Sequence, residues 1–263
     1  MLEFINLFAK IILEFSHESL IVPLIIIGYI WIDKKTFFHG ICLVLISMIF
    51  NAGLKATFQI PLSPALGKEG FAFPSGHMQT SIVLYGFLYK FSKNTIIKVS
   101  LVILLTLIAM SLIYFGYHNI YDILGALFFG LMLIFGYVSI KSKMPESRLF
   151  LAIILFTTCC MLYIRLIYQI SPHLWMAYYA LFGLLVSEYF FDNKQIKLDA
   201  KKSKIIATIF CFSSLFLTNI LFALLPNALS FLQSLRWFLI GFFIPFSVFL
   251  SYSIHCKGKA GDS

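Results

Sequence analysis

His118 and Asp122, a histidine and an aspartate four residues apart, are a pair with an evident chemical use in this sequence. On one helix the two side chains share a face, and the carboxylate can hold the imidazole in a fixed tautomer. A histidine oriented in this way can attack a phosphoryl group. The alternative is a structural pair, but that interpretation must explain why Asp122 is the only charged residue between Asn119 and Ile140.

The segment Pro74-Ser75-Gly76-His77 has the pattern of a helix start. Ser75 can cap the helix, and Gly76 lets another group approach the exposed backbone N–H groups closely. Such a terminus favours an anion such as phosphate. Taken alone, the same four residues also fit a capped helix with a surface histidine.

Lys55 adds a cation to this group of residues. It closes an apolar segment, where a lysine can also simply extend its charge to the membrane surface. Together, Lys55 and the helix start can hold a phosphate, His118 can attack it, and His77 can protonate the leaving oxygen. The combination predicts a phosphoryl-transfer site and is far more specific than its parts.

The composition indicates that the elements carrying this site are membrane helices. Of 263 residues, 60% are hydrophobic and only 12% are charged, against about one-quarter charged in an ordinary soluble domain. About nine apolar segments approach the roughly 20 residues that cross a bilayer. They are Leu20–Ile32, Phe37–Ala56, Pro74–Phe91, Thr95–Tyr117, Asn119–Ile140, Leu149–Ile170, His173–Phe191, Ile205–Leu225 and Leu235–Ile254. The predicted fold class is therefore all-α, a polytopic transmembrane helical bundle.

The N-terminal segment has a different pattern from these spans. Its polar residues recur at steps of three and four among Leu, Ile and Phe, which predicts an amphipathic helix in the membrane surface. We therefore expect an interfacial helix over 1–18, a core carrying the site over 19–140, and additional transmembrane helices over 141–263. No removable signal peptide is expected, and the five cysteines show no metal-type spacing.

The distribution of charge orients the predicted bundle. When the spans are threaded alternately, one face holds fifteen basic and six acidic residues, and the other holds five of each. The net charge of +9 therefore lies on one face, which the positive-inside rule assigns to the cytoplasm. Because a basic membrane face explains this charge, no nucleic-acid partner is expected. The site then faces a periplasm or exterior, across a plasma membrane (the inner membrane in bacteria).

At these residues the sequence resembles the type 2 phosphatidic acid phosphatase superfamily, integral-membrane lipid phosphatases related to vanadium haloperoxidases. The family carries Lys-x6-Arg-Pro, Pro-Ser-Gly-His and Ser-Arg-x5-His-x3-Asp. The second motif is intact at 74–77, and the third has the correct spacing from Ser111 to Asp122. The first keeps Lys55, and the chain beyond the motifs loosely resembles a branch of the family with extra spans after the core.

The resemblance implies a role for each matching residue. His118 would be the nucleophile that forms a phosphohistidine, Asp122 its orienting partner, and His77 the general acid. Lys55, Ser75 and the Gly76 backbone would bind phosphate oxygens. No metal and no cofactor are expected.

Two departures from the family pattern concern arginine. Leu62 and Leu112 stand where the family has arginines, which would neutralise the transferred phosphoryl group as bidentate ligands. Arg165 is the candidate replacement, with Arg236 as an alternative and Lys68 as a weaker one. Both arginines also fit a role as interfacial residues that extend to the membrane surface.

These observations predict an enzyme, a membrane lipid phosphatase whose substrate is an isoprenoid diphosphate or a phosphatidate-like lipid. Its partners would be that substrate and membrane lipids, and the sequence predicts no oligomeric state. The alternative is a catalytically impaired relative that binds or transports a phospholipid. An unrelated transporter is a third interpretation, but it would need charges that cross the bilayer.

Overall fold

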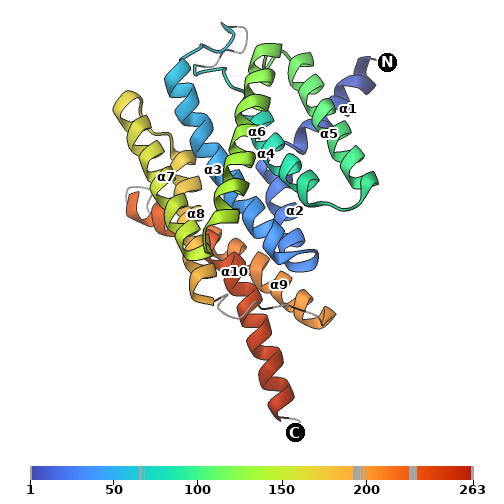
Figure 1. The fold of residues 1–263 in the computed structure, drawn as a ribbon, viewed down its shortest axis with the longest axis vertical. Coiled ribbons are helices and arrows are strands. Elements are labelled where there is room, and N and C mark those ends of the chain that lie inside the picture. Colours follow the sequence, from blue (N-terminus) through green and yellow to red (C-terminus); the bar gives the residue numbers. More distant parts are fainter. Residues whose placement is uncertain are drawn as a thin grey trace. The chain divides into compact units, whose positions relative to one another are not determined.

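The structure, a computed structural model, describes residues 2–64, 67, 69–191, 196, 198, 200–224 and 230–261. These residues form α-helices and no β-strand (Figure 1), so the predicted all-α class is confirmed. The helices are α1 (Leu2–Glu14), α2 (Glu18–Trp31), α3 (Lys34–Phe58), α4 (Gly76–Phe91), α5 (Thr95–Tyr114), α6 (Ile120–Lys143), α7 (Glu146–Ile167), α8 (Pro172–Phe191), α9 (Lys201–Ala223) and α10 (Ser230–Gly261).

Several of these helices are long and apolar enough to cross a membrane. Within the described residues there are seven, or eight if α1 and α2, which are bent by 50° relative to each other, count as one broken span. The predicted number of nine is not confirmed. The difference lies at α2, with 14 residues, and at α4, with 16, both shorter than the roughly 20 residues of a full span.

The chain divides into two compact units. The first contains Met1–Ile25 and His39–Ile170, and the second contains Ile26–Phe38 and Ser171–Ser263. All of the predicted catalytic residues belong to the first unit.

In the first unit, α4 is the helix around which the site is built. It packs against α5 and α6, and α1 packs against α5 (Figure 1). Gly130 of α6 allows the close approach, because a Cβ atom there would lie 2.8 Å from Cγ2 of Ile82 in α4. The apolar middle of α4 is buried, as its Val83 and Leu84 illustrate, so the polar residues of interest are confined to its N-terminal end.

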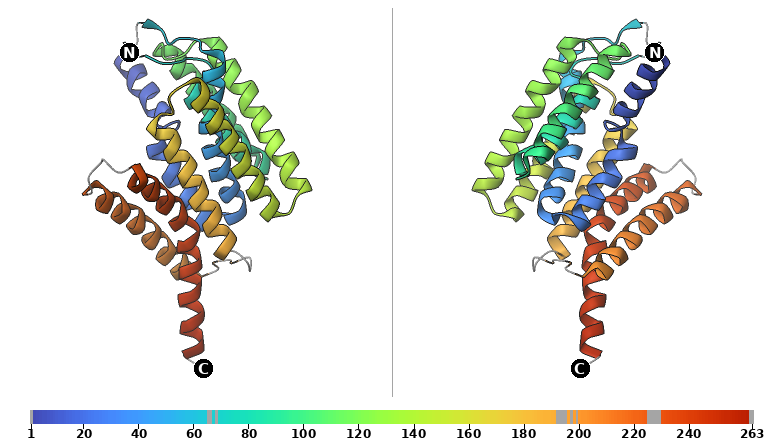
Figure 2. Two further views of the ribbon diagram at one scale, coloured as in Figure 1. Left: turned by 90° about the vertical axis from the view of Figure 1, so that its left-hand side faces the viewer. Right: turned by 90° about the vertical axis from the view of Figure 1, so that its right-hand side faces the viewer.

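The second unit is built on a close crossing of α8 and α10, and α9 also packs on α10 (Figure 2). A Cβ atom on Gly183 would overlap the carbonyl oxygen of Phe238, and one on Gly241 would overlap that of Ala180. Small residues that let two backbones touch are typical of helix contacts in membranes.

Candidate active site

His118 lies in the turn between α5 and α6. The turn begins where α5 ends at Tyr114, and it needs Gly116, whose φ of +68° is unfavourable for a residue with a Cβ atom. The backbone N–H groups of Tyr117 and His118 then donate to the carbonyl oxygen of Leu112 at 3.1 and 3.4 Å. These bonds fold the turn back on the end of α5 and fix the position of the imidazole.

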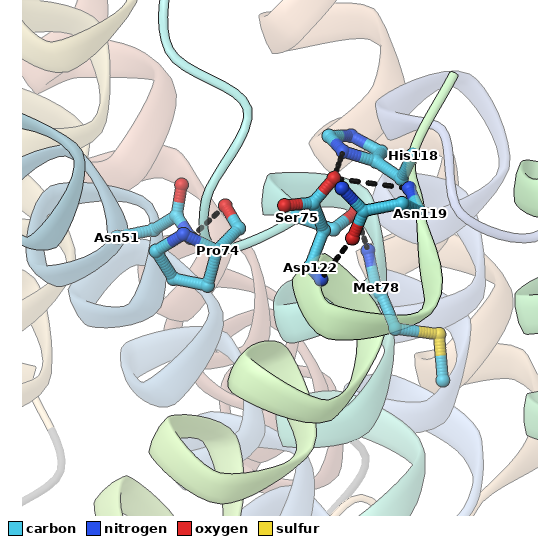
Figure 3. Close-up of polar contacts among 7 residues, drawn as sticks. All are labelled: Asn51, Pro74, Ser75, Met78, His118, Asn119 and Asp122. Atoms are coloured by element: carbon cyan, nitrogen blue, oxygen red, sulfur yellow. Dashed lines mark hydrogen bonds and ion pairs between the residues drawn. The ribbon is translucent and has the colours of Figure 1, made fainter. Parts of the chain in front are cut away.

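Asp122 connects this turn to the first turn of α6 (Figure 3). Its Oδ2 atom accepts a hydrogen bond from the backbone N–H of Asn119 at 3.0 Å and lies 3.2 Å from Nδ1 of His118. In return, Oδ1 of Asn119 accepts from the backbone N–H of Asp122 at 2.9 Å, which completes a capping box. Asp122 is only 2% exposed, so its carboxylate has both a structural and an orienting contact.

The hydrogen bond to Asp122 determines which nitrogen of His118 can react. A carboxylate accepts, so Nδ1 carries the proton and Nε2 keeps its lone pair. Burial lowers the pKa of the His118 imidazole from its ordinary value, and the hydrogen bond to Asp122 offsets part of that shift. The imidazole is therefore neutral near pH 7, as a nucleophile must be.

Ser75 caps α4 and joins it to α6. Its Oγ atom accepts from the backbone N–H of Met78 at 3.4 Å, and its own backbone N–H donates to the carbonyl oxygen of Asp122 at 3.2 Å (Figure 3). The next two N–H groups of α4, those of Gly76 and His77, have no acceptor among the described residues. The helix start thus leaves two donors for a ligand.

A buried polar network between α3 and α4 holds this helix start in place. The sequence did not lead us to predict it. The Asn51 amide donates to the carbonyl oxygen of Pro74 at 3.2 Å and to Oε1 of Gln79 at 2.9 Å. The Gln79 amide in turn donates to the Ser47 hydroxyl at 3.4 Å. The spacing in the sequence could have indicated that Asn51 lies at the site, because Asn51 precedes Lys55 by four residues and so lies on the same face of α3.

The structure places four of the predicted residues, Lys55, His77, His118 and Asp122, within electrostatic range. The charge of Lys55 interacts with Asp122, with His77 and with His118, and the two imidazoles also interact with each other. The side chains of Lys55 and His77 make no hydrogen bond or ion pair within the described residues. The four residues, which come from four segments, are therefore linked by electrostatic interactions through Lys55 and His118.

The family of this segment follows from comparison with known proteins. Residues 32–145 match the model of the PAP2 superfamily. The resemblance to the type 2 phosphatidic acid phosphatases is confirmed over this range, which contains α3 to α6 and all three motifs. The match supports phosphatase activity in general, on a phosphate ester, in a protein with several membrane-type helices. No curated protein and no solved structure matches the chain.

The two leucines of the PAP2 segment that replace family arginines lie in different environments. Leu112, in α5, is buried with only 2% of its surface exposed. The hydroxyl of the neighbouring Ser111 donates to the carbonyl oxygen of Leu107 in the same helix. Leu62 is half-buried in the loop before α4, where its side chain faces Gly70. Of the two positions, Leu62 is the more exposed.

Of the predicted replacement cations, Arg165 makes no hydrogen bond or ion pair with this group within the described residues. Arg165 is exposed in the last turn of α7, whose Tyr163 hydroxyl bonds to Thr57 of α3 at 2.9 Å. Two helical positions differ by about 200°, so Arg165 points away from the face that meets α3. Arg236, in the second unit, bonds through Nε and Nη2 to Oδ1 of Asn219 at 3.1 and 2.6 Å. Lys68 lies outside the described residues.

Proposed function

We propose that the PAP2 segment hydrolyses the phosphate ester or diphosphate of a membrane lipid through a phosphohistidine on His118. The observation that carries this proposal is the neutral, oriented imidazole of His118 near a helix start and a lysine. Among the described residues, two N–H groups of that helix start and the side chain of Lys55 have no hydrogen-bond partner. A binding site for phosphate needs the donors but has no use for a nucleophile with an orienting carboxylate.

The reaction divides into two steps. In the first, Nε2 of His118 attacks phosphorus while the bond to the leaving oxygen breaks, and His77 transfers a proton to that oxygen. Burial and the charges of His17, His118 and Lys55 lower the pKa of His77 to about 4. His77 therefore takes up this proton only when the negative charge of the bound phosphate raises its pKa. In the second, neutral His77 accepts a proton from water, whose oxygen attacks phosphorus and breaks the bond to Nε2. Phosphate leaves, and both histidines return to their starting states.

The phosphate oxygens would be held by groups at the start of α4 and the end of α3. Lys55 supplies a positive charge, and the N–H groups of Gly76 and His77 supply hydrogen bonds at the positive end of the helix dipole. The hydrogen of the Ser75 hydroxyl remains available, because its oxygen serves the cap only as an acceptor. Arg165 is also a candidate phosphate ligand. It is a weaker candidate than Lys55, because it lies on the side of α7 opposite Tyr163, which contacts α3.

A lipid substrate is favoured by the surroundings of this site. The α1 helix, which packs on α5, exposes Phe4, Leu7, Phe8 and Ile11. Such an apolar surface beside the site suits acyl or isoprenoid chains. We infer that residues 1–18 lie in the membrane interface, that the site opens to the outward leaflet of the plasma membrane, and that the basic loops are cytoplasmic.

One observation favours the second candidate, a relative that binds or transports a phospholipid without cleaving it. Neither arginine of the family pattern is present, and Leu112 is part of the core. Loss of one transition-state donor typically costs about a hundredfold to a thousandfold in rate.

A phosphate-release assay separates the two candidates. Purified full-length protein is incubated with phosphatidate and with isoprenoid monophosphates and diphosphates, in parallel with His118→Ala and His173→Ala. His173 is an exposed histidine at the start of α8 and serves as the matched control. We expect release by the wild type and by His173→Ala and none by His118→Ala. Equal background rates for all three proteins on every substrate would overturn the phosphatase and favour the binding protein.

A further inference from the structure

A third histidine lies at the site, and neither the motifs nor the spacing pointed to it. His17 occupies the joint between α1 and α2, and its ring centroid is 4.9 Å from that of His77, with 59° between the ring planes. Both side chains are exposed, and their charges interact. The joint therefore brings an imidazole to the start of α4, beside the proposed general acid.

Several contacts within the first unit hold this joint in place. The Tyr85 hydroxyl of α4 donates to the carbonyl oxygen of Phe15 at 2.6 Å, two residues before His17. Ser16 is buried, and its hydroxyl donates to the carbonyl oxygen of Leu13 at 2.7 Å. At the other end of α1, Tyr114 donates to Asn6 at 2.9 Å. His17 thus belongs to a segment anchored to both α4 and α5.

Within the part of the chain that the structure describes, the side chains of His17, His77 and Lys55 form no hydrogen bond or ion pair. Glu14 and Glu18 flank His17 in the chain, but neither forms an ion pair with it within the described residues, and the Glu14 carboxylate accepts a hydrogen bond from Ser19. Asp122, whose charge interacts with Lys55, is occupied by Asn119 and His118. Three nitrogen-bearing side chains whose charges repel are stabilised by an anion between them, and phosphate accepts hydrogen bonds both from imidazoles and from an ammonium group.

The PAP2 segment also has a deficit of positive charge that these side chains can reduce. Positions 62 and 112 carry leucine, the guanidinium of Arg236 is bonded to Asn219, and Arg165 points away from α3. We propose that His17 donates a hydrogen bond to the phosphoryl group bound at the start of α4, supplying part of the positive charge that family members obtain from arginine. This assignment rests on the proposed function, because it places the phosphoryl group at that helix start.

The test uses full-length protein and four variants. His17→Ala removes the donor, His17→Gln keeps a neutral donor, His17→Arg provides a permanent charge, and His173→Ala is the control. Binding of inorganic phosphate and of vanadate is measured by calorimetry, and kcat/KM is measured on a short-chain phosphatidate. Thermal unfolding of each variant checks the fold, which an exposed position should preserve.

We expect His17→Ala to weaken binding of both anions at least about tenfold and to lower kcat/KM about a hundredfold. His17→Arg should restore most of both losses, which a merely structural role for His17 does not predict. We expect His17→Gln, a neutral donor, to bind both anions more weakly than His17→Arg, and this ranking decides the question if His17→Ala fails to fold. Wild-type levels of binding and turnover in His17→Ala would overturn the assignment, as would a wild type that binds neither anion.

Binding and turnover also separate this assignment from the proposed function. A wild type that binds phosphate in a His17-dependent way but releases none from any lipid would overturn the phosphatase while supporting the contact by His17. Turnover that persists unchanged in His17→Ala would support the phosphatase while overturning the contact by His17.

Discussion

The backbone N–H of Ser75 donates a hydrogen bond to the carbonyl oxygen of Asp122 at 3.2 Å. This bond joins the first turn of α4, which leaves donors for a phosphate, to the first turn of α6, whose aspartate orients His118. The distance from the proposed nucleophile to the phosphate position therefore depends on the backbone rather than on flexible side chains.

Replacement of the Asp122 carboxylate by an amide should separate its two contacts. Asp122→Asn keeps an acceptor for the Asn119 N–H but no longer favours the Nδ1–H tautomer of His118. We expect kcat to fall about a thousandfold or more, the order typical of such an exchange, with little change in thermal stability. Asp122→Ala should in addition lose about 1 kcal/mol of stability with the cap. Wild-type turnover by Asp122→Asn would remove the carboxylate from the mechanism.

The acid side of the pH profile should reflect the burial of His118. Because burial lowers the pKa of His118, the imidazole stays neutral below the ordinary value of about 6.5. We expect the limb of kcat/KM that depends on the nucleophile to fall only below that value. Asp122 raises the pKa, so the residual activity of Asp122→Asn should have its acid limb at still lower pH. A limb that shifts to higher pH in this variant would contradict the assignment.

The lowered pKa of His118 also makes the free energy of unfolding depend on pH. A histidine whose pKa is lower in the folded state takes up its proton first in the unfolded chain. The contribution of neutral His118 to the free energy of unfolding is therefore present above the unfolded-state pKa and is lost as the pH falls through the folded-state value.

Reintroduction of the two family arginines should have opposite results. Leu62 is half-buried in a loop, so Leu62→Arg should fold normally and raise kcat/KM about tenfold by adding a cation near the phosphate. Leu112 is 2% exposed, so Leu112→Arg buries a charge and should lower stability by about 3 kcal/mol or more. Thermal unfolding and phosphate release of both variants check this contrast. A stable, more active Leu112→Arg protein would show that the α5 core can open.

Comparison of Arg165→Ala with His17→Ala shows which of the two residues contributes more to phosphate binding. Because Arg165 points away from the face of α7 that meets α3, we expect its removal to weaken phosphate binding less than His17→Ala does. Calorimetry with inorganic phosphate measures both. If Arg165→Ala leaves phosphate binding unchanged while His118→Ala abolishes release, Arg165 plays no part in the site.

The contacts that depend on short stretches of chain could be predicted from the sequence. The spacing of His118 and Asp122 and the cap at Ser75 are local, and the structure contains both. The position of His17 was not predictable, because it depends on a bend of 50° between α1 and α2 and on Tyr85, far along the chain. Nor does hydropathy reveal that Leu112 is fully packed in the core, or that the helix starting at Gly76 has only 16 residues.

The double use of one oxygen atom, Oδ2 of Asp122, affects how genetic experiments should be interpreted. Substitutions that leave no acceptor at this position, such as Asp122→Ala, remove a helix contact and a chemical contact together, so a growth defect in a cell would not distinguish a misassembled protein from an inert one. Substitutions of Asn119, which shares only the helix contact, provide the comparison that tells the two causes apart.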